Sequence, residues 1–146
     1  MVIREATPRD GSALAALWQQ AGLKFVAEHV PGELASVLAR HPGLVLVTED
    51  PQGLAASVLG TYDGRRGWVN RLATRPDWRG QGLASGLLAT VEDRLAAMGC
   101  RKINLLIEPD KGEVVHFYQR LGYTQDDLIF MEKWLRRDQG SAARPG

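Results

Sequence analysis

The sequence has a single cysteine, almost no net charge and no long apolar run. Cys100 is the only cysteine among 146 residues, so a disulfide framework and a cysteine-based metal cluster are both excluded. Lysine and arginine number 18 against 17 aspartate and glutamate, which gives a net charge of +1. This balance gives no general argument for a nucleic-acid or membrane partner. The composition favours a soluble globular protein in a reducing cytoplasm, with its binding chemistry confined to a local site.

No segment is typical of membrane insertion or secretion. No apolar run reaches the roughly 18 residues that span a bilayer, and the first ten residues lack the apolar core of a signal peptide. A length of 146 residues fits one compact domain with its own hydrophobic core. We expect a single domain over residues 1–136 and a flexible tail over residues 137–146.

Hydrophobic periodicity predicts a chain of alternating helices and strands. Helical spacing predicts helices at 8–21, 32–40, 83–98 and 111–121. Apolar runs and alternation predict strands at 2–5, 44–49, 54–62, 68–74, 102–108 and 127–135. Short turns make the strands from 44 to 74 antiparallel, whereas the long helical crossover makes the next one parallel. The predicted fold class is α/β (α+β): a mixed, mostly antiparallel six- to seven-stranded sheet flanked by about four helices.

Residues 79–85, Arg-Gly-Gln-Gly-Leu-Ala-Ser, join a predicted strand to a predicted helix; we call this segment the glycine bend. The first amide N–H groups of a helix have no partner inside the helix, and the helix dipole is positive there. Glycines let an anion approach such amides closely, and Arg79 adds a charged donor. The glycine bend therefore predicts a pyrophosphate site. Further arginines lie nearby in the sequence: Arg65, Arg66, Arg71 and Arg75.

Two glycines before a helix also fit a plain tight connection, and their spacing alone leaves this alternative open. A dinucleotide-binding site would need a third glycine where this chain has Ser85, and an acid about 20 residues later. The lysine of a phosphate-binding P-loop is absent as well. The surrounding sequence must decide.

The stretch Arg79-Gly80-Gln81-Gly82-Leu83-Ala84 resembles the Q/R-x-x-G-x-G/A signature of the GNAT superfamily of N-acetyltransferases. It stands between the fourth predicted strand and the third predicted helix, as in that family. Residues 117–123, Phe-Tyr-Gln-Arg-Leu-Gly-Tyr, are similar to a second motif of the family, an aromatic pair followed by glycine and an aromatic residue. The resemblance covers residues 2–135, and within the family it is closest to a YpeA-like bacterial branch.

The resemblance implies acetyl-CoA as co-substrate, bound where two central parallel strands, 68–74 and 102–108, splay apart. The backbone at the end of the first of these strands would hold the pantetheine arm, and the amides of the glycine bend would hold the pyrophosphate. The implied cofactor-binding residues are Leu72, Ala73, Thr74, Arg79, Gly80, Gln81, Gly82, Leu83, Ala84 and Ser85. No metal is expected, because the three histidines have no ligand spacing.

Acetyl transfer to an amine needs a neutral amine, a donor for the oxyanion and a proton for the departing thiolate. The resemblance implies that Tyr118 protonates the coenzyme A sulfur; its place in an apolar helix stripe equally fits simple core packing. A backbone N–H near Ala73 is the expected oxyanion donor. The predicted strand 68–74 lacks the glutamate that many relatives carry, and Asn70 is its nearest polar candidate. Glu108, at the end of the predicted strand 102–108, is a candidate base but equally fits a surface acid, and another residue or a water chain is the alternative.

These observations predict an N-acetyltransferase that moves the acetyl group of acetyl-CoA to a primary amine by direct attack in a ternary complex. The acceptor, a small molecule or a peptide, stays open, and residues 22–42 are expected to shape that choice. The alternatives are a non-catalytic acyl-CoA binding or sensing module and, third, a nucleotide-binding enzyme. Neither nucleic acid nor a membrane is an expected partner, and an exposed last strand would allow a homodimer.

Overall fold

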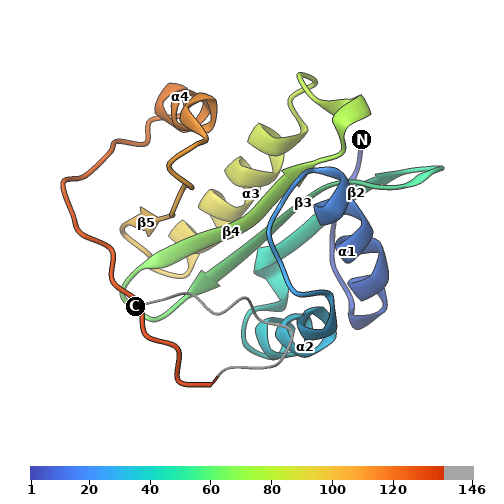
Figure 1. Ribbon diagram of the computed structural model, residues 1–146, viewed down its shortest axis with the longest axis horizontal. Helices are drawn as coiled ribbons and strands as arrows, with labels where there is room; N and C mark the ends of the chain where they lie inside the picture. The colour runs from blue at the N-terminus through green and yellow to red at the C-terminus, as the bar shows by residue number, and fades with distance from the viewer. Residues whose placement is uncertain (137–146) are drawn as a thin grey trace. The chain divides into compact units, whose positions relative to one another are not determined.

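The computed structural model describes residues 1–136, which fall into two compact units (Figure 1). The larger unit, Met1–Leu106, holds all the strands found in these residues. The smaller unit begins at Ile107 and has one described helix. The tail expected at 137–146 lies outside the described residues, and the single domain over 1–136 stays a prediction.

The larger unit is built on a five-stranded mixed sheet in the order β1-β2-β3-β4-β5. The strands are β1 (Ile3–Glu5), β2 (Val45–Asp50), β3 (Gly53–Tyr62), β4 (Gly67–Thr74) and β5 (Ile103–Asn104). β1 to β4 pair antiparallel, and β5 runs parallel to β4. The mixed, mostly antiparallel sheet is confirmed, with five strands in residues 1–136 where the sequence predicted six to seven.

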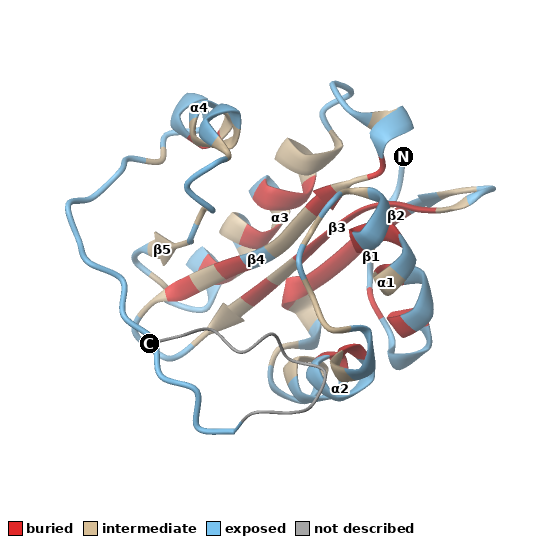
Figure 2. Cartoon of the chain, in the orientation of Figure 1, coloured by how far each residue is buried: buried red, intermediate tan, exposed pale blue. Residues whose placement is uncertain are grey.

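Helices cover both faces of this sheet (Figure 1). α1 (Gly11–Gln20) packs on one face together with α2 (Val30–Arg40), and α3 (Leu83–Ala97) packs on the other. Residues of β3 face the two helix layers alternately. The Ser57 hydroxyl bonds to Trp18 of α1, whereas a Cβ on Gly60 would point toward Val91 of α3. Because both faces are covered, β2 and β3 are buried along most of their length (Figure 2).

Two glycines let α3 lie close to the sheet. Leu87, Leu88, Val91 and Leu95 of α3 are at most 1% exposed. A Cβ on Gly67 would lie 2.8 Å from Leu95 Cδ1, and one on Gly60 would lie 3.0 Å from Val91 Cγ1. Both distances are shorter than ordinary carbon contacts of about 3.5–4.0 Å. Close approach of the helix, rather than an unusual backbone angle, therefore explains glycine at these two positions.

A buried ion cluster fixes the chain as it leaves β4. Arg75, 8% exposed, forms ion pairs with Asp50 at the end of β2 and with Asp77. Its Nη1 also donates to the Leu54 carbonyl at 3.3 Å, and Trp78 Nε1 donates to Asp50 Oδ2 at 2.8 Å. Every nitrogen of the guanidinium group thus has an acceptor. The cluster anchors the connection between β4 and the glycine bend.

Two predicted strands differ from the observed ones. The strand predicted at 102–108 is reduced to Ile103–Asn104, because its parallel pairing with β4 stops after two residue pairs. The strand predicted at 127–135 is not formed: this segment has no helix or strand, and its apolar residues 128–131 are consecutive rather than alternating. Its large side chains Leu128, Ile129, Phe130, Met131 and Leu135 are exposed. An apolar segment makes a strand only when a neighbouring edge accepts its backbone hydrogen bonds.

The smaller unit contains α4 (Gly112–Arg120). Tyr118 on this helix is 7% exposed, and the rings of Phe117 and Tyr123 lie edge-on to it at 5.2 and 5.3 Å between centroids. No helix in the described part of either unit is long and apolar enough to cross a membrane.

The ion cluster predicts an acid-dependent loss of stability that Asp50→Asn should reduce. Hydrogen bonds from Arg75 and Trp78 hold the pKa of Asp50 below its usual value. The cluster therefore contributes stability that is fully present above the unfolded pKa of about 3.9 and is lost as the pH falls toward the folded pKa. Between about pH 5 and about pH 2, urea unfolding should show a steeper fall in unfolding free energy for the parent than for Asp50→Asn.

Asp93→Asn on α3 is the matched control, because Asp93 is exposed. This variant should keep the parent's slope. At neutral pH, Asp50→Asn should also be less stable than the parent, since it removes a charged partner from a buried guanidinium. Equal slopes in Asp50→Asn and the parent would contradict the assigned role of the cluster.

Candidate functional site

Within the larger unit, β4 has a free edge along most of its length, because its pairing with β5 ends after two residue pairs. On the other side, the Arg75 N–H donates to the Ala55 carbonyl at 2.7 Å. Alternation in an antiparallel ladder then turns the N–H and C=O of Ala73 toward β3, and those of Leu72 and Thr74 toward the free edge. Of the three residues expected to hold a pantetheine arm, Leu72 and Thr74 have backbone groups available for it.

A β-bulge interrupts β4 immediately before these residues. The pairing register with β3 shifts between Ser57 and Leu59, and Arg71 has a φ of 54°, in the left-handed region that few non-glycine residues adopt. The Ser57 hydroxyl donates to the Arg71 carbonyl at 2.9 Å and accepts from Trp18 Nε1 at 2.9 Å. Because a bulge changes the direction of the strand backbone, it sets where Leu72 presents its amide. No feature of the sequence signals this bulge.

The glycine bend follows the short 3-10 helix Pro76–Trp78 and ends in α3. Gly80 and Gly82 have φ values of 76° and 82°, and Gly82 is the N-cap residue of α3. The left-handed conformation costs other residues about 1–2 kcal/mol, so glycine is the fitting residue here. The backbone N–H groups of residues 80–85 donate to no acceptor within residues 1–136. This run of amides at the start of a 15-residue helix is a site for an anion.

The glycine bend carries three polar side chains, those of Arg79, Gln81 and Ser85. Ser85 Oγ donates to the Gly82 carbonyl at 3.2 Å, so the hydroxyl oxygen stays open as an acceptor or a second contact. Arg79 is exposed, and its Nη2 makes a long bond of 3.4 Å to the Ala21 carbonyl at the end of α1. The role of Arg79 as the charged donor beside the amides stays a prediction.

The other arginines near the bend in sequence do not serve it. Arg75 is enclosed by its carboxylate partners in the ion cluster. The guanidinium of Arg71 lies over the Trp18 ring, on the α1 side of the sheet. Arg65 and Arg66 lie in the turn between β3 and β4, where both backbone amides bond to one carboxylate. Nearness in sequence is misleading here, because β4 directs its side chains alternately to its two faces.

The two residues expected to act in catalysis belong to the smaller unit. Burial raises the pKa of Tyr118 to about 12, so its phenol is protonated at neutral pH. Glu108 is exposed, and its carbonyl accepts from the Lys111 N–H at 3.1 Å in the segment before α4. The expectation that Glu108 ends the fifth strand is wrong, because that strand stops at Asn104.

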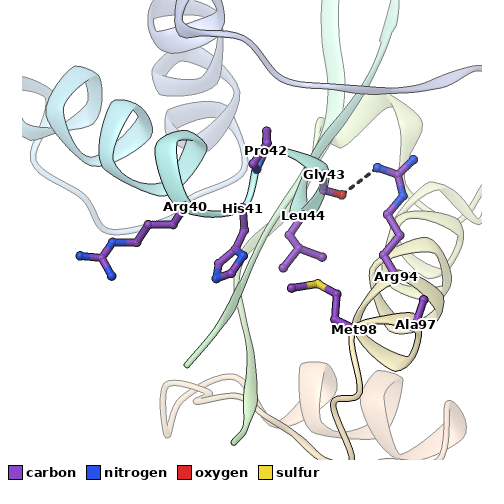
Figure 3. A pocket seen from close by; sticks show the side chains of 8 residues that line it. All are labelled: Arg40, His41, Pro42, Gly43, Leu44, Arg94, Ala97 and Met98. Atoms are coloured by element: carbon purple, nitrogen blue, oxygen red, sulfur yellow. Dashed lines mark hydrogen bonds between the residues drawn. The ribbon is translucent and has the colours of Figure 1, made fainter. Parts of the chain in front are cut away.

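A pocket of about 310 Å³ lies at the other end of α3, away from the glycine bend (Figure 3). It is lined by Arg40, His41, Pro42, Gly43, Leu44, Arg94, Ala97 and Met98. A rise of about 1.5 Å per residue places the last turn of α3 roughly 20 Å from its first. Arg94 donates to the Gly43 carbonyl at 2.8 Å, His41 Nε2 lies 2.9 Å from the Tyr62 carbonyl, and Arg40 points outward. The polar groups of this wall are thus already engaged and belong to no site at the bend.

Among the described residues, no group of three or more His, Cys, Asp or Glu side chains is placed to hold a metal ion. The chemistry of the site described above is that of backbone amides and one arginine. It suits a ligand with a pyrophosphate group and an amide-bearing arm.

Comparison with known proteins gives a consistent result. The sequence pattern of the acetyltransferase (GNAT) family matches residues 13–123. An acetyltransferase of Sodalis glossinidius (strain morsitans) is 34% identical over 140 residues, which are 95% of this chain and 99% of that protein. An acetyltransferase of Yersinia enterocolitica is 34% identical over 139 residues, with the same coverage.

Solved structures share the fold. The ribosomal-protein-S18-alanine N-acetyltransferase from Escherichia coli matches with a TM-score of 0.74 at 20% identity, over 86% of this chain and 79% of that one. The PaiA N-acetyltransferase from Thermoplasma acidophilum, solved in complex with coenzyme A, matches with a TM-score of 0.76 at 16% identity, over 88% of this chain and 92% of that one. Together with the sequence match over most of its length, these findings establish that the chain belongs to the acetyltransferase (GNAT) family and is an acetyltransferase.

Proposed function

We propose that this protein transfers the acetyl group of acetyl-CoA to a primary amine, by direct attack of the amine within a ternary complex. The observation that carries the proposal is the run of unpartnered amides in the glycine bend, which follows the free edge of β4 along the chain. Family membership supports acetyl transfer, and the Thermoplasma acidophilum PaiA structure supports coenzyme A as the ligand class.

The proposed cofactor site uses the two backbone features in sequence order. The pantetheine arm carries amide groups, which would pair with the Leu72 carbonyl and with the backbone of Thr74 as an added strand does with a sheet edge. The pyrophosphate would accept hydrogen bonds from the amides of the glycine bend, with Arg79 as the charged donor and Ser85 as a further contact. Ala73, between the two edge residues, fixes their spacing through its pairing with Ser57 of β3.

The proposed reaction forms a C–N bond at the thioester carbon and breaks the C–S bond. The amine nitrogen loses a proton to a base, for which Glu108 and a water chain are the candidates. The oxyanion of the tetrahedral intermediate would accept from the Leu72 N–H, which the bulge directs to the free edge. The departing thiolate would accept a hydrogen bond from Tyr118.

The raised pKa of Tyr118 favours one kind of help from the phenol over another. Its value of about 12 lies well above the roughly 8.5 of an ordinary thiol. Complete proton transfer from this phenol to a thiolate is therefore unfavourable. We propose that Tyr118 stabilises the developing thiolate by donating a hydrogen bond. The proton released by the amine then converts this thiolate to the product thiol.

A panel of amines tests the proposed function. The purified protein is mixed with acetyl-CoA and, separately, with spermidine, free lysine, a peptide with an alanine amino terminus and an aminoglycoside. We expect at least one amine to accelerate the release of free thiol and to appear as its acetylated product by mass spectrometry. Thiol release that no amine accelerates, despite tight binding of acetyl-CoA, would contradict amine acetylation and favour a binding or sensing role.

Gly80→Ala and Gly82→Ala test the glycine bend as the pyrophosphate site. Each variant puts a side chain on a residue whose φ is 76° or 82°, at a cost of about 1–2 kcal/mol. Relaxation of this strain moves the amides, so the Kd for coenzyme A should rise about tenfold. Isothermal titration calorimetry measures the change.

Gly86→Ala is the matched control for these glycines. Gly86 lies within α3, its φ is not positive, and an added Cβ would meet nothing within 4 Å. We expect the Kd of this variant to equal that of the parent. An unchanged Kd in Gly82→Ala as well would remove the bend from the proposed site.

Tyr118→Phe tests the proposed hydrogen bond to the thiolate. Phenylalanine fills the same buried space, so the KM for acetyl-CoA should change little, whereas kcat should fall about 10²-fold. Because the phenol has a pKa of about 12, kcat of the parent should show no titration of this group between about pH 6 and about pH 10.

Tyr62→Phe provides the control, since this tyrosine on β3 donates only to the Gly64 carbonyl of an adjacent turn. Its kcat should match that of the parent. If Tyr118→Phe also keeps the parent's kcat on a confirmed acceptor, Tyr118 is a packing residue and the thiolate has another donor.

A further inference from the structure

The guanidinium of Arg71 reaches from the bulge of β4 to the chain that follows α1. Its Nη1 donates to the Lys24 carbonyl at 2.8 Å, and its Nη2 lies 3.7 Å from Glu33 Oε2 on α2. The central guanidinium carbon lies 4.9 Å from the centroid of the Trp18 ring and 6.0 Å from that of Phe25. These two rings contact each other edge-on at 5.7 Å. One side chain of β4 therefore contacts α1, α2 and the segment between them.

The segment that Arg71 holds lacks regular structure, although its side chains Leu23 and Phe25 pack against the hydrophobic core. Residues 21–26, which we call the α1 turn, contain no helix, no strand and no fully buried residue. Its first residues stay close to α1 through backbone bonds such as Leu23 N–H to the Trp18 carbonyl, 2.9 Å. Arg79 of the glycine bend adds the long bond to the Ala21 carbonyl. In the later residues of the α1 turn, the Phe25 ring packs on Trp18, and the bond from Arg71 to the Lys24 carbonyl ties the backbone to β4.

Arg71 is also the residue at the bulge of β4, where its backbone has a φ of 54°. Its carbonyl accepts from Ser57, and the next N–H along the chain is that of Leu72, the proposed oxyanion donor. Non-glycine residues in this conformation persist where surrounding contacts hold them, and such residues gather at functional sites. Here the contacts are the guanidinium bonds to the α1 turn and to Glu33, together with the two aromatic rings.

We infer that Arg71 is a positioning residue for acetyl transfer: its guanidinium ties the α1 turn to the bulge of β4, and thereby fixes the acceptor side and the Leu72 amide relative to each other. The inference rests on the proposed function, since it concerns the same strand edge. Arg71 does not touch the proposed cofactor. A planar fork is required, because a carbonyl, a carboxylate and a ring face are bound at once, which the single ammonium of lysine cannot do.

Two variants separate the guanidinium from the backbone conformation. Arg71→Asn removes the guanidinium, whereas asparagine tolerates a positive φ and keeps the bulge. Arg71→Lys keeps the charge and removes the fork. Arg9→Asn, an exposed arginine in the first 3-10 helix, is the control. Three quantities are measured: kcat with the amine most active in the panel, the Kd for coenzyme A, and amide hydrogen exchange of residues 22–26.

We expect kcat of Arg71→Asn to fall about 10²-fold, as a displacement of about 1 Å at the reacting groups would cause, while the Kd for coenzyme A stays that of the parent. Added guanidinium chloride, at a concentration that does not unfold the protein, should restore part of the lost kcat. Arg71→Lys should lose nearly as much as Arg71→Asn. Amide exchange of residues 22–26 should accelerate in both variants and not in Arg9→Asn.

Parental kcat in Arg71→Asn would overturn the inference. A loss of kcat that guanidinium chloride does not restore, accompanied by a weaker fold, would assign Arg71 to stability alone and would overturn it too. If the parent turns over no amine, the proposed function fails. The amide exchange data alone then test whether Arg71 ties the α1 turn to β4. Faster exchange of residues 22–26 then supports the tether, and unchanged exchange overturns it.

Discussion

The structure depends on backbone amides that are kept without partners. Alternate N–H groups at the free edge of β4 and successive ones through the glycine bend make no bond within the described residues, although unpaired amides are rare in folded proteins. Such groups adopt a defined direction only if their neighbours are fixed. The ion cluster of Arg75 and the buried Trp18–Ser57–Arg71 chain of hydrogen bonds supply that fixation, at the end of β4 and at its bulge respectively. Together they hold both sides of Leu72 and Thr74.

The ion cluster is better understood as a positional device than as a source of net stability. Removing a guanidinium and carboxylates from water is costly, and their attraction returns that cost only when geometry and hydrogen bonding are good. Here the carboxylate of Asp50 also accepts from the Trp78 indole, so β2, β4 and the start of the bend meet in one set of directional bonds. An apolar cluster of equal volume would stabilise the fold without specifying these angles. The angles matter, because the amides that follow must converge on one ligand.

The sequence was most informative where a local rule decides structure. Gly80 and Gly82 indicated a tight connection before a helix, and both adopt the positive φ values open to glycine. Prediction from the sequence failed where the structure depends on a neighbouring strand or side chain far away in the sequence. Apolar segments at 102–108 and 127–135 indicated strands, but a strand needs a neighbouring edge to pair with, and β5 pairs with β4 over two residues only. Arg71 and Arg75 were grouped with the phosphate site because they precede it, yet one stacks on Trp18 and the other is enclosed by carboxylates. The bulge had no signal, since arginine has no preference for positive φ.

Arginine at the bulge raises the question why glycine, which stands at the other two positive-φ positions of this stretch, does not stand there. At positions 80 and 82 a side chain would add nothing, because the backbone itself meets the ligand, and an added Cβ meets at most Ser85 Oγ at 3.9 Å. At position 71 the backbone needs the same conformation, and the side chain also binds the α1 turn through the Lys24 carbonyl and the Phe25 ring. Glycine would give the bulge without the tether, and a β-branched residue would give neither. An arginine in a strained conformation is the residue that supplies both, and the strain is balanced by contacts to four neighbours rather than by any intrinsic preference.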